Sequence, residues 1–229
     1  DNGDVVQGYI PTNYSTQPGT YTLKFTDTET GTSTTKEIKI VARDFRVQRL
    51  TVDTSVESST KTDEGYAEYR KYFNPSRETS SPVKYYTDSF ILPTQGKLTT
   101  EFGESRYVND VLTNYRHAGI DIAAPRNAKV LATNTGKVVL SMSMILTGNS
   151  IVIDHGEGIF SVYFHLDKRY VEEGDMVTRG QLIAAVGSTG FSTGPHLHFT
   201  MSYYRFDIEP GYLLYGETLT KSNYLELMK

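Results

Sequence analysis

The sequence predicts an all-β protein whose largest domain is built from antiparallel sheet, and three observations support that prediction. Between residues 90 and 214, short segments rich in β-branched residues follow one another, as in KVLATNTGKVVLSM and NSIVIDHGEGIFSVYFHL. Glycine-containing turns such as TG, HGEG and STG separate these segments. The stretch shows no sustained 3.6-residue periodicity of an amphipathic helix. Strands that follow strands favour an antiparallel sheet over an alternating α/β fold.

The first part of the chain, residues 1–53, is predicted to be a small β-rich module. Residues 20–25 (TYTLKF) and 35–42 (TKEIKIVA) flank the polar turn TDTETGTST, which is the pattern of a β-hairpin. Residues 45–52 (FRVQRLTV) form a further strand-like run. Because so short a stretch makes a small core, we expect either a small sheet or part of a larger β module.

Residues 54–89 are predicted to contain a short helix and a linker. The run SSTKTDEGYAEYRKYF carries acidic residues early and basic residues late, an order that suits the helix dipole. It ends at NPSRETSSP, which is turn chemistry. We therefore place the principal domain at residues 90–215. The remaining residues, 216–229, form a short polar tail to which the sequence assigns no role.

Composition excludes several function classes. The 229 residues carry a net charge of −4, so no cationic excess is available for a phosphate backbone, and we expect no nucleic-acid partner. No apolar run approaches the roughly 18 residues that cross a bilayer. The chain begins DNGDVV, without the basic and apolar regions of an export signal, so we expect that signal to be absent from this chain. With no cysteine, any metal must be held by nitrogen and oxygen.

The five histidines of the chain all lie within residues 117–198. In GPHLHF, residues two apart on a strand project to the same face, so His196 and His198 are expected to point into one site. In HAGID, Asp121 follows His117 by four residues and would face the same site from a neighbouring strand. Two imidazoles and a carboxylate suit catalytic zinc or non-haem iron, and strand geometry alone does not choose between His196 and His198.

His155 is the exception among the histidines. It lies in DHGEG, a turn-like context, where we expect a local hydrogen bond or a surface position rather than metal binding.

From residue 90 to residue 214 the chain resembles the lysostaphin-type (LytM-domain) zinc metallopeptidases. The matching motifs, in the order of the family, are LTTEFGESR, RHAGIDIAAP, GNSIVIDHG, VYFHL, VEEGDMVTRGQLIAAVGSTG and STGPHLHF. The resemblance implies an antiparallel fold of the duplicated hybrid motif type. The FG-x-x-R run further implies that Arg106 lies near the site as an orienting or substrate-binding group. The β-rich segment before residue 53 is similar to part of the N-terminal module of exported members.

The resemblance also implies roles for the histidines. His117, Asp121 and His198 match the three ligands of one Zn²⁺ ion, whereas His165 and His196 match the two catalytic histidines that do not bind it. Water activated at such an ion would attack the amide, with one histidine receiving its proton and the other stabilising the oxyanion. We assign His196 to the water and His165 to the oxyanion, an order that the sequence leaves open.

The substrate follows from the resemblance alone. Relatives hydrolyse peptide bonds in peptidoglycan stems or cross-bridges, which implies an extracytoplasmic location (periplasmic, cell-surface or secreted). One alternative is a non-catalytic LytM-type domain that binds or activates a separate cell-wall hydrolase, and another is a wall-binding module with structural histidines. The full set of matched ligands favours the enzyme. Residues 1–89 are long enough to reach the groove, so we also expect that they could hold the enzyme latent.

Overall fold

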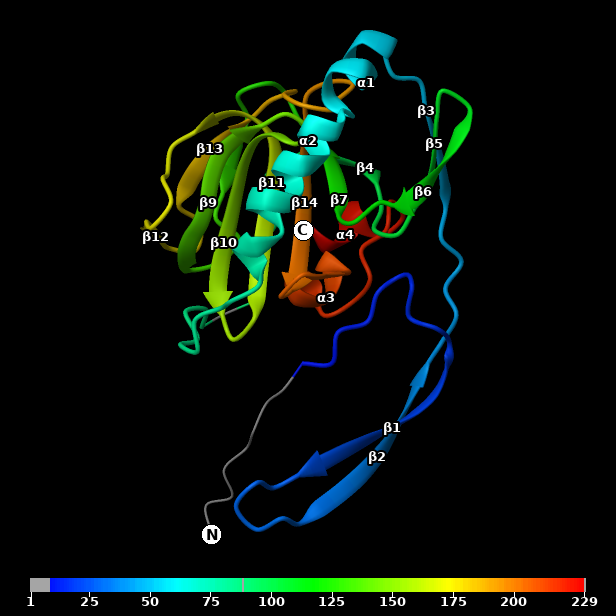
Figure 1. Cartoon of the computed structure of the whole chain (residues 1–229), viewed down its shortest axis with the longest axis vertical. Coiled ribbons are helices and arrows are strands. Elements are labelled where there is room, and N and C mark those ends of the chain that lie inside the picture. The colour runs from blue at the N-terminus through cyan, green and yellow to red at the C-terminus, as the bar shows by residue number, and fades with distance from the viewer. Residues whose placement is uncertain (1–8, 88, 229) are drawn as a thin grey trace.

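The computed structural model describes residues 9–87 and 89–228, which form a β-rich body with a hairpin extending from it (Figure 1). The expectation about an export signal concerns the opening residues DNGDVV, which lie outside this described part. The strands are β1 (Gly19–Thr26), β2 (Ser33–Ile40), β3 (Val47–Leu50), β4 (Lys97–Thr100), β5 (Ser105–Val108), β6 (Val111–Arg116), β7 (Ile120–Ala123), β8 (Lys129–Leu131), β9 (Gly136–Met144), β10 (Gly148–Gly156), β11 (Ile159–Arg169), β12 (Met176–Val177), β13 (Leu182–Val186), β14 (His196–Tyr203) and β15 (Phe206–Ile208). The helices are α1 (Thr54–Thr60), α2 (Asp63–Glu68), the π-helical η1 (Tyr69–Phe73), the 3₁₀ turn η2 (Pro75–Arg77), α3 (Pro210–Tyr215) and α4 (Tyr224–Leu227).

The main sheet confirms the predicted antiparallel all-β class. Its principal path is β12–β9–β10–β11–β14–β7–β4, with β13 and β8 attached beside β11, and β15 beside β14. Its paired strands all run antiparallel. β10 and β11 lie at its centre and are buried along most of their lengths, as their β-branched and aromatic residues favour.

The two faces of this sheet bury separate hydrophobic clusters. Successive side chains of a strand point to opposite faces, so Tyr163 packs against Phe199 in the larger cluster, whereas Phe164 packs against Phe73 in the smaller one. The smaller cluster is covered by η1. The face that carries Phe164 is also the one on which the candidate site is built.

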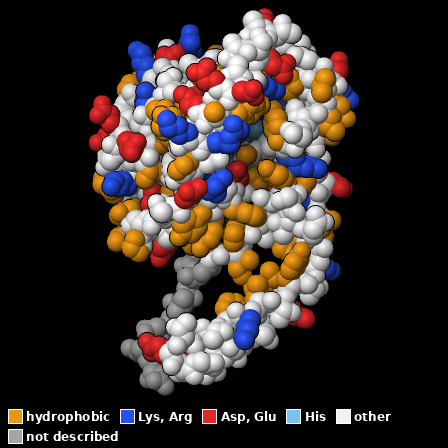
Figure 2. Space-filling model, in the orientation of Figure 1, with side chains coloured by type: hydrophobic (Ala, Val, Ile, Leu, Met, Phe, Trp, Pro, Cys, Tyr) orange, Lys and Arg blue, Asp and Glu red, His pale blue; other side chains and the backbone are white. Residues whose placement is uncertain are grey.

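The predicted hairpin is confirmed as β1 and β2, which pair antiparallel along both strands. One of its faces places Tyr21 opposite Ile38, and the other places Thr22 opposite Glu37. Tyr21 is 40% exposed and Phe25 is 50% exposed. Figure 2 shows that the hairpin reaches away from the rest of the molecule, with hydrophobic side chains on its surface.

The strand-like run at 45–52 is confirmed as β3, and its pairing partner is distant in sequence. β3 pairs parallel with β5, which pairs antiparallel with β6, giving a separate three-stranded sheet. β3 lies in the predicted module 1–53 and β5 in the predicted domain 90–215, so this sheet joins the two stretches.

The helical segment differs from the single short helix expected from SSTKTDEGYAEYRKYF. It begins earlier, at α1, and breaks into α1, α2 and η1. Each of the two α-helices starts at its own N-cap: the Asp53 side chain accepts a hydrogen bond from the backbone of Ser55 at the start of α1, and the Thr62 side chain accepts one from Gly65 at the start of α2. The cap at Thr62 separates α2 from α1. Among the described helices, none is long and apolar enough to cross a membrane.

The C-terminal tail has a structural role that the sequence did not indicate. Leu219 and Tyr224 are 0% and 2% exposed and belong to the larger hydrophobic cluster. The preceding helix α3 is capped by Glu209, whose side chain also accepts a hydrogen bond from the backbone of Leu219. The tail is too short for its apolar residues to show a periodic signal, which is why the sequence did not reveal this packing.

Candidate metal centre

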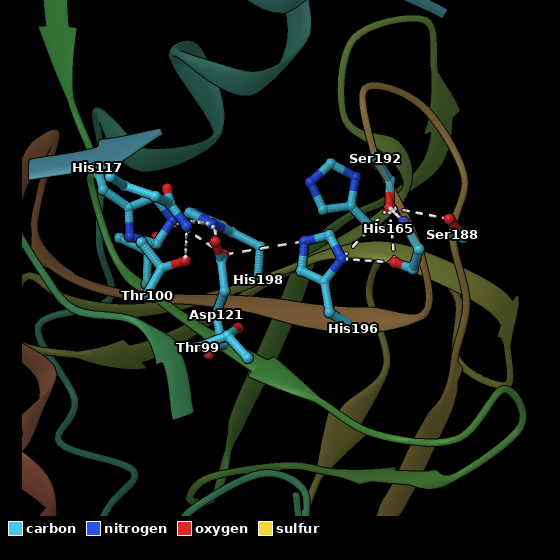
Figure 3. Close-up of polar contacts among 12 residues, drawn as sticks. Thr99, Thr100, His117, Asp121, His165, Ser188, Ser192, His196 and His198 are labelled. Atoms are coloured by element: carbon cyan, nitrogen blue, oxygen red, sulfur yellow. Dashed lines mark hydrogen bonds and ion pairs between the residues drawn. The ribbon is translucent and has the colours of Figure 1, made fainter. Parts of the chain in front are cut away.

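Three predicted ligands converge on one point beside the paired strands β7 and β14 (Figure 3). Asp121 on β7 lies directly opposite His198 on β14, and His117 comes from the turn before β7. The atoms His117 Nε2, Asp121 Oδ1 and His198 Nδ1 form a triangle with three sides of 2.9 Å. Ile120 and Ile122 are fully buried on the other side of β7, so the alternation of the strand turns Asp121 toward the histidines as predicted.

The protonation of His117 makes this triangle a good fit for a cation. Its Nδ1 lies 3.1 Å from the backbone carbonyl of Glu101, which can only accept, so Nδ1 carries the proton. Nε2 is therefore the ring nitrogen that faces Asp121 and His198, and it is the atom of His117 that would bind a cation. Nitrogen and oxygen ligands of one tetrahedral zinc ion lie roughly 3.3 Å apart, close to the separation found here.

The surroundings hold the other two donors in the forms that bind metal. Burial lowers the pKa of His198 to about 4, so its ring is neutral near pH 7. Burial by itself would raise the pKa of Asp121, but the charge and hydrogen bond of His117 and the hydrogen bond of His198 outweigh it and hold that pKa well below its ordinary value. The His198 ring also stacks on Phe164, with the ring centres 5.4 Å apart. The donor set therefore offers two imidazole nitrogens and a carboxylate.

His196 shares the face of His198, as the strand alternation predicts, but it stands apart from the triangle. Its Nε2 lies 3.9 Å from Asp121 Oδ1. Its Nδ1 lies 2.8 Å from the carbonyl of Gly194, to which it donates, so Nε2 of the neutral ring carries a lone pair. The geometry thus separates two histidines that were equivalent on the strand pattern alone.

His165 reaches the site through an unusual backbone conformation. Its φ of +61° lies in the left-handed region, which residues other than glycine adopt at a cost. Its backbone N–H donates to Thr147 and its Nδ1 donates to the carbonyl of Thr189, and these bonds hold it there. Burial, with a smaller effect of the neighbouring histidines, lowers its pKa to about 3. His165 is therefore neutral near pH 7 and turns the lone pair of Nε2 outward.

Arg106 lies beside the site, where the resemblance placed it. Its Nη2 donates to Asp121 Oδ2 over 3.2 Å, and its Nε donates to Gln48 Oε1 over 2.8 Å. Gln48 in turn donates to the hydroxyl of Thr100. Gln48 belongs to β3, and no sequence pattern pointed to it, because its role depends on the long-range pairing of β3 with β5.

Of the two alternatives expected for His155, a local hydrogen bond or a surface position, the first is confirmed. The local hydrogen bonds are present, since its Nδ1 donates to the carbonyl of Thr135 and its Nε2 accepts from the hydroxyl of Ser161. A surface position is wrong, because His155 is fully buried and lies within β10 rather than in a turn. It is packed edge-on against Phe90 and stays away from the triangle.

The donors open into a cavity of about 920 Å³. Six of its lining residues precede residue 90, and sequence reasoning identified none of them: Tyr14, Gln48, Leu50, Lys61, Tyr66 and Tyr69. The Nζ of Lys61 lies 4.2 Å from the centre of the Phe191 ring, on the loop that leads to β14. The helical segment therefore forms a roof over part of the cavity.

Comparisons with known proteins agree with this geometry. Residues 115–210 match the family model of peptidase family M23. The chain is 47% identical over 83 residues to the peptidoglycan DD-endopeptidase ShyB of Vibrio cholerae, a match covering 36% of this chain and 20% of that protein. It is 35% identical over 133 residues to the murein hydrolase activator NlpD of Escherichia coli, covering 58% of this chain and 32% of that protein. The chain thus spans well under half the length of these relatives.

A solved structure shows the same fold over most of the chain. A Pseudomonas aeruginosa protein assigned to peptidase M23 superposes with a TM-score of 0.69 at 23% identity, covering 90% of this chain and 77% of the other. The family match contains all three members of the donor triangle and both neighbouring histidines. Residues 115–210 are therefore identified as a peptidase family M23 (LytM-type) domain by the family model.

Proposed function

We propose that the protein is a zinc-dependent endopeptidase that hydrolyses peptide bonds in peptidoglycan stem peptides or cross-bridges. The observation that carries this proposal is the complete donor triangle of His117, Asp121 and His198 at 2.9 Å separations. Two further histidines, His165 and His196, line the same cavity. The similarity to a peptidoglycan DD-endopeptidase supports the substrate class. Since peptidoglycan lies outside the cytoplasmic membrane, we propose that the protein acts there.

The proposed chemistry divides between the ion and the two free histidines. A zinc ion with an open position would lower the pKa of water from 15.7 to about 7 and polarise the scissile carbonyl. His196, the nearer ring to Asp121, receives a proton from the attacking water at Nε2 and passes it to the leaving amine. His165 accepts a hydrogen bond from the other hydrogen of that water and orients it. Because Nδ1 of His165 carries the proton of the neutral ring, its Nε2 has no hydrogen to donate to an oxyanion. We therefore propose that His165 orients the water, in place of the oxyanion role expected from the sequence.

The test is mass spectrometry of fragments released from purified peptidoglycan by the zinc-loaded protein, with and without a chelator. We expect chelator-sensitive release of peptide fragments. His117→Ala should lose metal and activity together. His196→Ala should keep one equivalent of metal and lose about 10²–10⁴-fold in rate, the usual size of an acid–base contribution. Metal binding without any released fragment would refute the enzyme and leave the metal site standing.

A second candidate function is activation of a separate cell-wall hydrolase, favoured by the similarity to the activator NlpD. The same digestion distinguishes it. An activator releases no peptidoglycan fragments by itself but increases the release by an added hydrolase. The His196→Ala variant of an activator should increase that release as much as the original chain does.

We also propose that the segment before residue 90 restricts access to the site. Lys61, Tyr66 and Tyr69 line the cavity from this segment, and Lys61 contacts both Glu57 on α1 and the Phe191 ring. A long peptidoglycan strand would have to displace this roof, whereas a short peptide would not.

A further inference from the structure

The turn of residues 101–104 (EFGE) holds His117 at three points. The backbone N–H of His117 donates to the carbonyl of Glu104 over 3.0 Å, and the N–H of Gly103 donates to the carbonyl of His117 over 2.8 Å. The ring Nδ1 donates to the carbonyl of Glu101 over 3.1 Å. The position, the tilt and the tautomer of this donor therefore all depend on where the turn lies.

The same turn carries two carboxylates that are almost wholly buried. The Glu101 side chain is 5% exposed and that of Glu104 is 2% exposed. The backbone N–H of Glu101 donates to Glu104 Oε1 over 3.1 Å, which holds the two residues close together. Like charges buried side by side are stable only where cations and hydrogen bonds compensate them. The turn can keep its shape only with such partners.

Those partners come from both sides of the family match, 115–210. After it, Lys221 in the tail contacts both carboxylates: its Nζ lies 2.9 Å from Glu104 Oε1, and its backbone N–H donates to Glu101 Oε1 over 2.9 Å. Before it, Arg46 Nε lies 3.5 Å from Glu101 Oε1. Arg43 Nη2 also lies 3.9 Å from Glu101 Oε2. Two arginines thus face Glu101, whereas Lys221 is the cation that contacts Glu104 among the described residues, and it lies closest to its carboxylate.

We propose that Lys221 is a positioning residue for the metal centre, acting on His117 through the 101–104 turn. The inference rests on the proposed metal site and is independent of which bond, if any, is cleaved. Removing the ammonium leaves Glu104 buried without its cation, so the turn must shift. This shift moves the carbonyls that fix the His117 ring. Partners of metal ligands typically change metal affinity by about 10–100-fold when they are lost.

The experiment measures Zn²⁺ affinity by competition with a chromophoric chelator, and the visible absorption of Co²⁺ as a probe of ligand geometry. The full chain is compared with Lys221→Met, Lys221→Arg and the control Arg77→Met. Arg77 forms a buried ion pair with Asp207, so its loss also weakens the fold, but neither residue contacts the turn. All measurements are made well below the unfolding temperature of each variant.

We expect Lys221→Met to weaken Zn²⁺ binding about 10–100-fold and to alter the Co²⁺ spectrum. Lys221→Arg should bind within a few-fold of the original chain. Arg77→Met, whose guanidinium contacts Phe73 and not the turn, should lose less affinity than Lys221→Met despite its reduced stability. If Lys221→Met does not fold, the milder Lys221→Gln takes its place, with an expected loss near the lower end of that range. Unchanged affinity and spectrum in the folded lysine variant, or an equal loss in Arg77→Met, would overturn the proposal, whether or not the protein proves to be a peptidase.

Discussion

His155 is the one histidine that the structure places away from the metal centre, and its burial predicts a specific pH dependence of stability. Desolvation lowers its pKa to about 4 in the folded chain. In the unfolded chain its pKa returns to about 6.5. Between these two values the unfolded chain binds more protons at this residue, so the free energy of unfolding falls as the pH falls. The contribution of His155 is fully present above pH 6.5 and is lost progressively toward pH 4.

The size of this effect follows from the two pKa values. Each unit of difference corresponds to about 1.4 kcal/mol, which gives a total of about 3 kcal/mol. Integrating the difference in bound protons gives a loss of about 2 kcal/mol between pH 7.5 and pH 5, a range in which the folded chain can be measured. Burial of the whole ring is the physical source of this difference, and the hydrogen bond to Thr135 and the charge of Asp154 partly oppose it.

The perturbation is His155→Gln, and the assay is urea unfolding of both chains between pH 5 and pH 7.5 in metal-free buffer. The other titrating groups are common to both chains, so the difference between the two curves isolates this residue. We expect the variant to be less stable at pH 7.5, because the buried partners lose hydrogen bonds, and this deficit to shrink by about 2 kcal/mol at pH 5. A difference that stays constant within about 0.5 kcal/mol over the range would refute the reasoning.

Three further predictions follow from the cavity and its walls. Lys61→Ala should raise kcat/KM for long peptidoglycan strands several-fold and leave short peptides unaffected, whereas Lys71→Ala on the same segment should change neither; equal rates for both variants would exclude the roof as a barrier. Gly119→Ala should cost about 1–3 kcal/mol in urea unfolding and weaken metal binding, because the new Cβ would lie 2.2 Å from a carbonyl oxygen of β14 and would push β7 away. Arg106→Met should lower Zn²⁺ affinity about 10-fold in chelator competition, since it removes a hydrogen bond to a ligand carboxylate; unchanged affinity would show that this bond does not support the site.

Strand alternation was sufficient to predict the centre of the site. It turned Asp121 and His198 away from the core, because each lies between buried apolar residues, and it put His196 on the face of His198. The choice between His196 and His198 needed tertiary information. Register puts His198 opposite Asp121, whereas His196 lies opposite Ala123, two residues further along β7.

His165 is a position at which the same rule would mislead. Strict alternation would send Phe164 and His165 to opposite faces, yet both line the cavity. The positive φ of His165 reverses its side chain at the point where the pairing of β11 with β14 ends. Such a conformation depends on hydrogen bonds to Thr147 and Thr189, which the local sequence does not reveal. The resemblance identified this residue; the period of the strand did not.

The supporting residues of the metal centre come from segments that are distant in sequence. Gln48 on β3 holds the arginine that contacts the Asp121 carboxylate. Phe73 on η1 packs against the Phe164 ring that stacks on His198. Lys221 in the tail neutralises the turn that fixes the third donor. Each donor of the triangle therefore depends on a residue outside positions 115–210, although the donors themselves lie within that match. Local patterns could predict that Asp121, His196 and His198 share a site, whereas the rigidity that keeps the three donor atoms 2.9 Å apart is a property of the whole described chain.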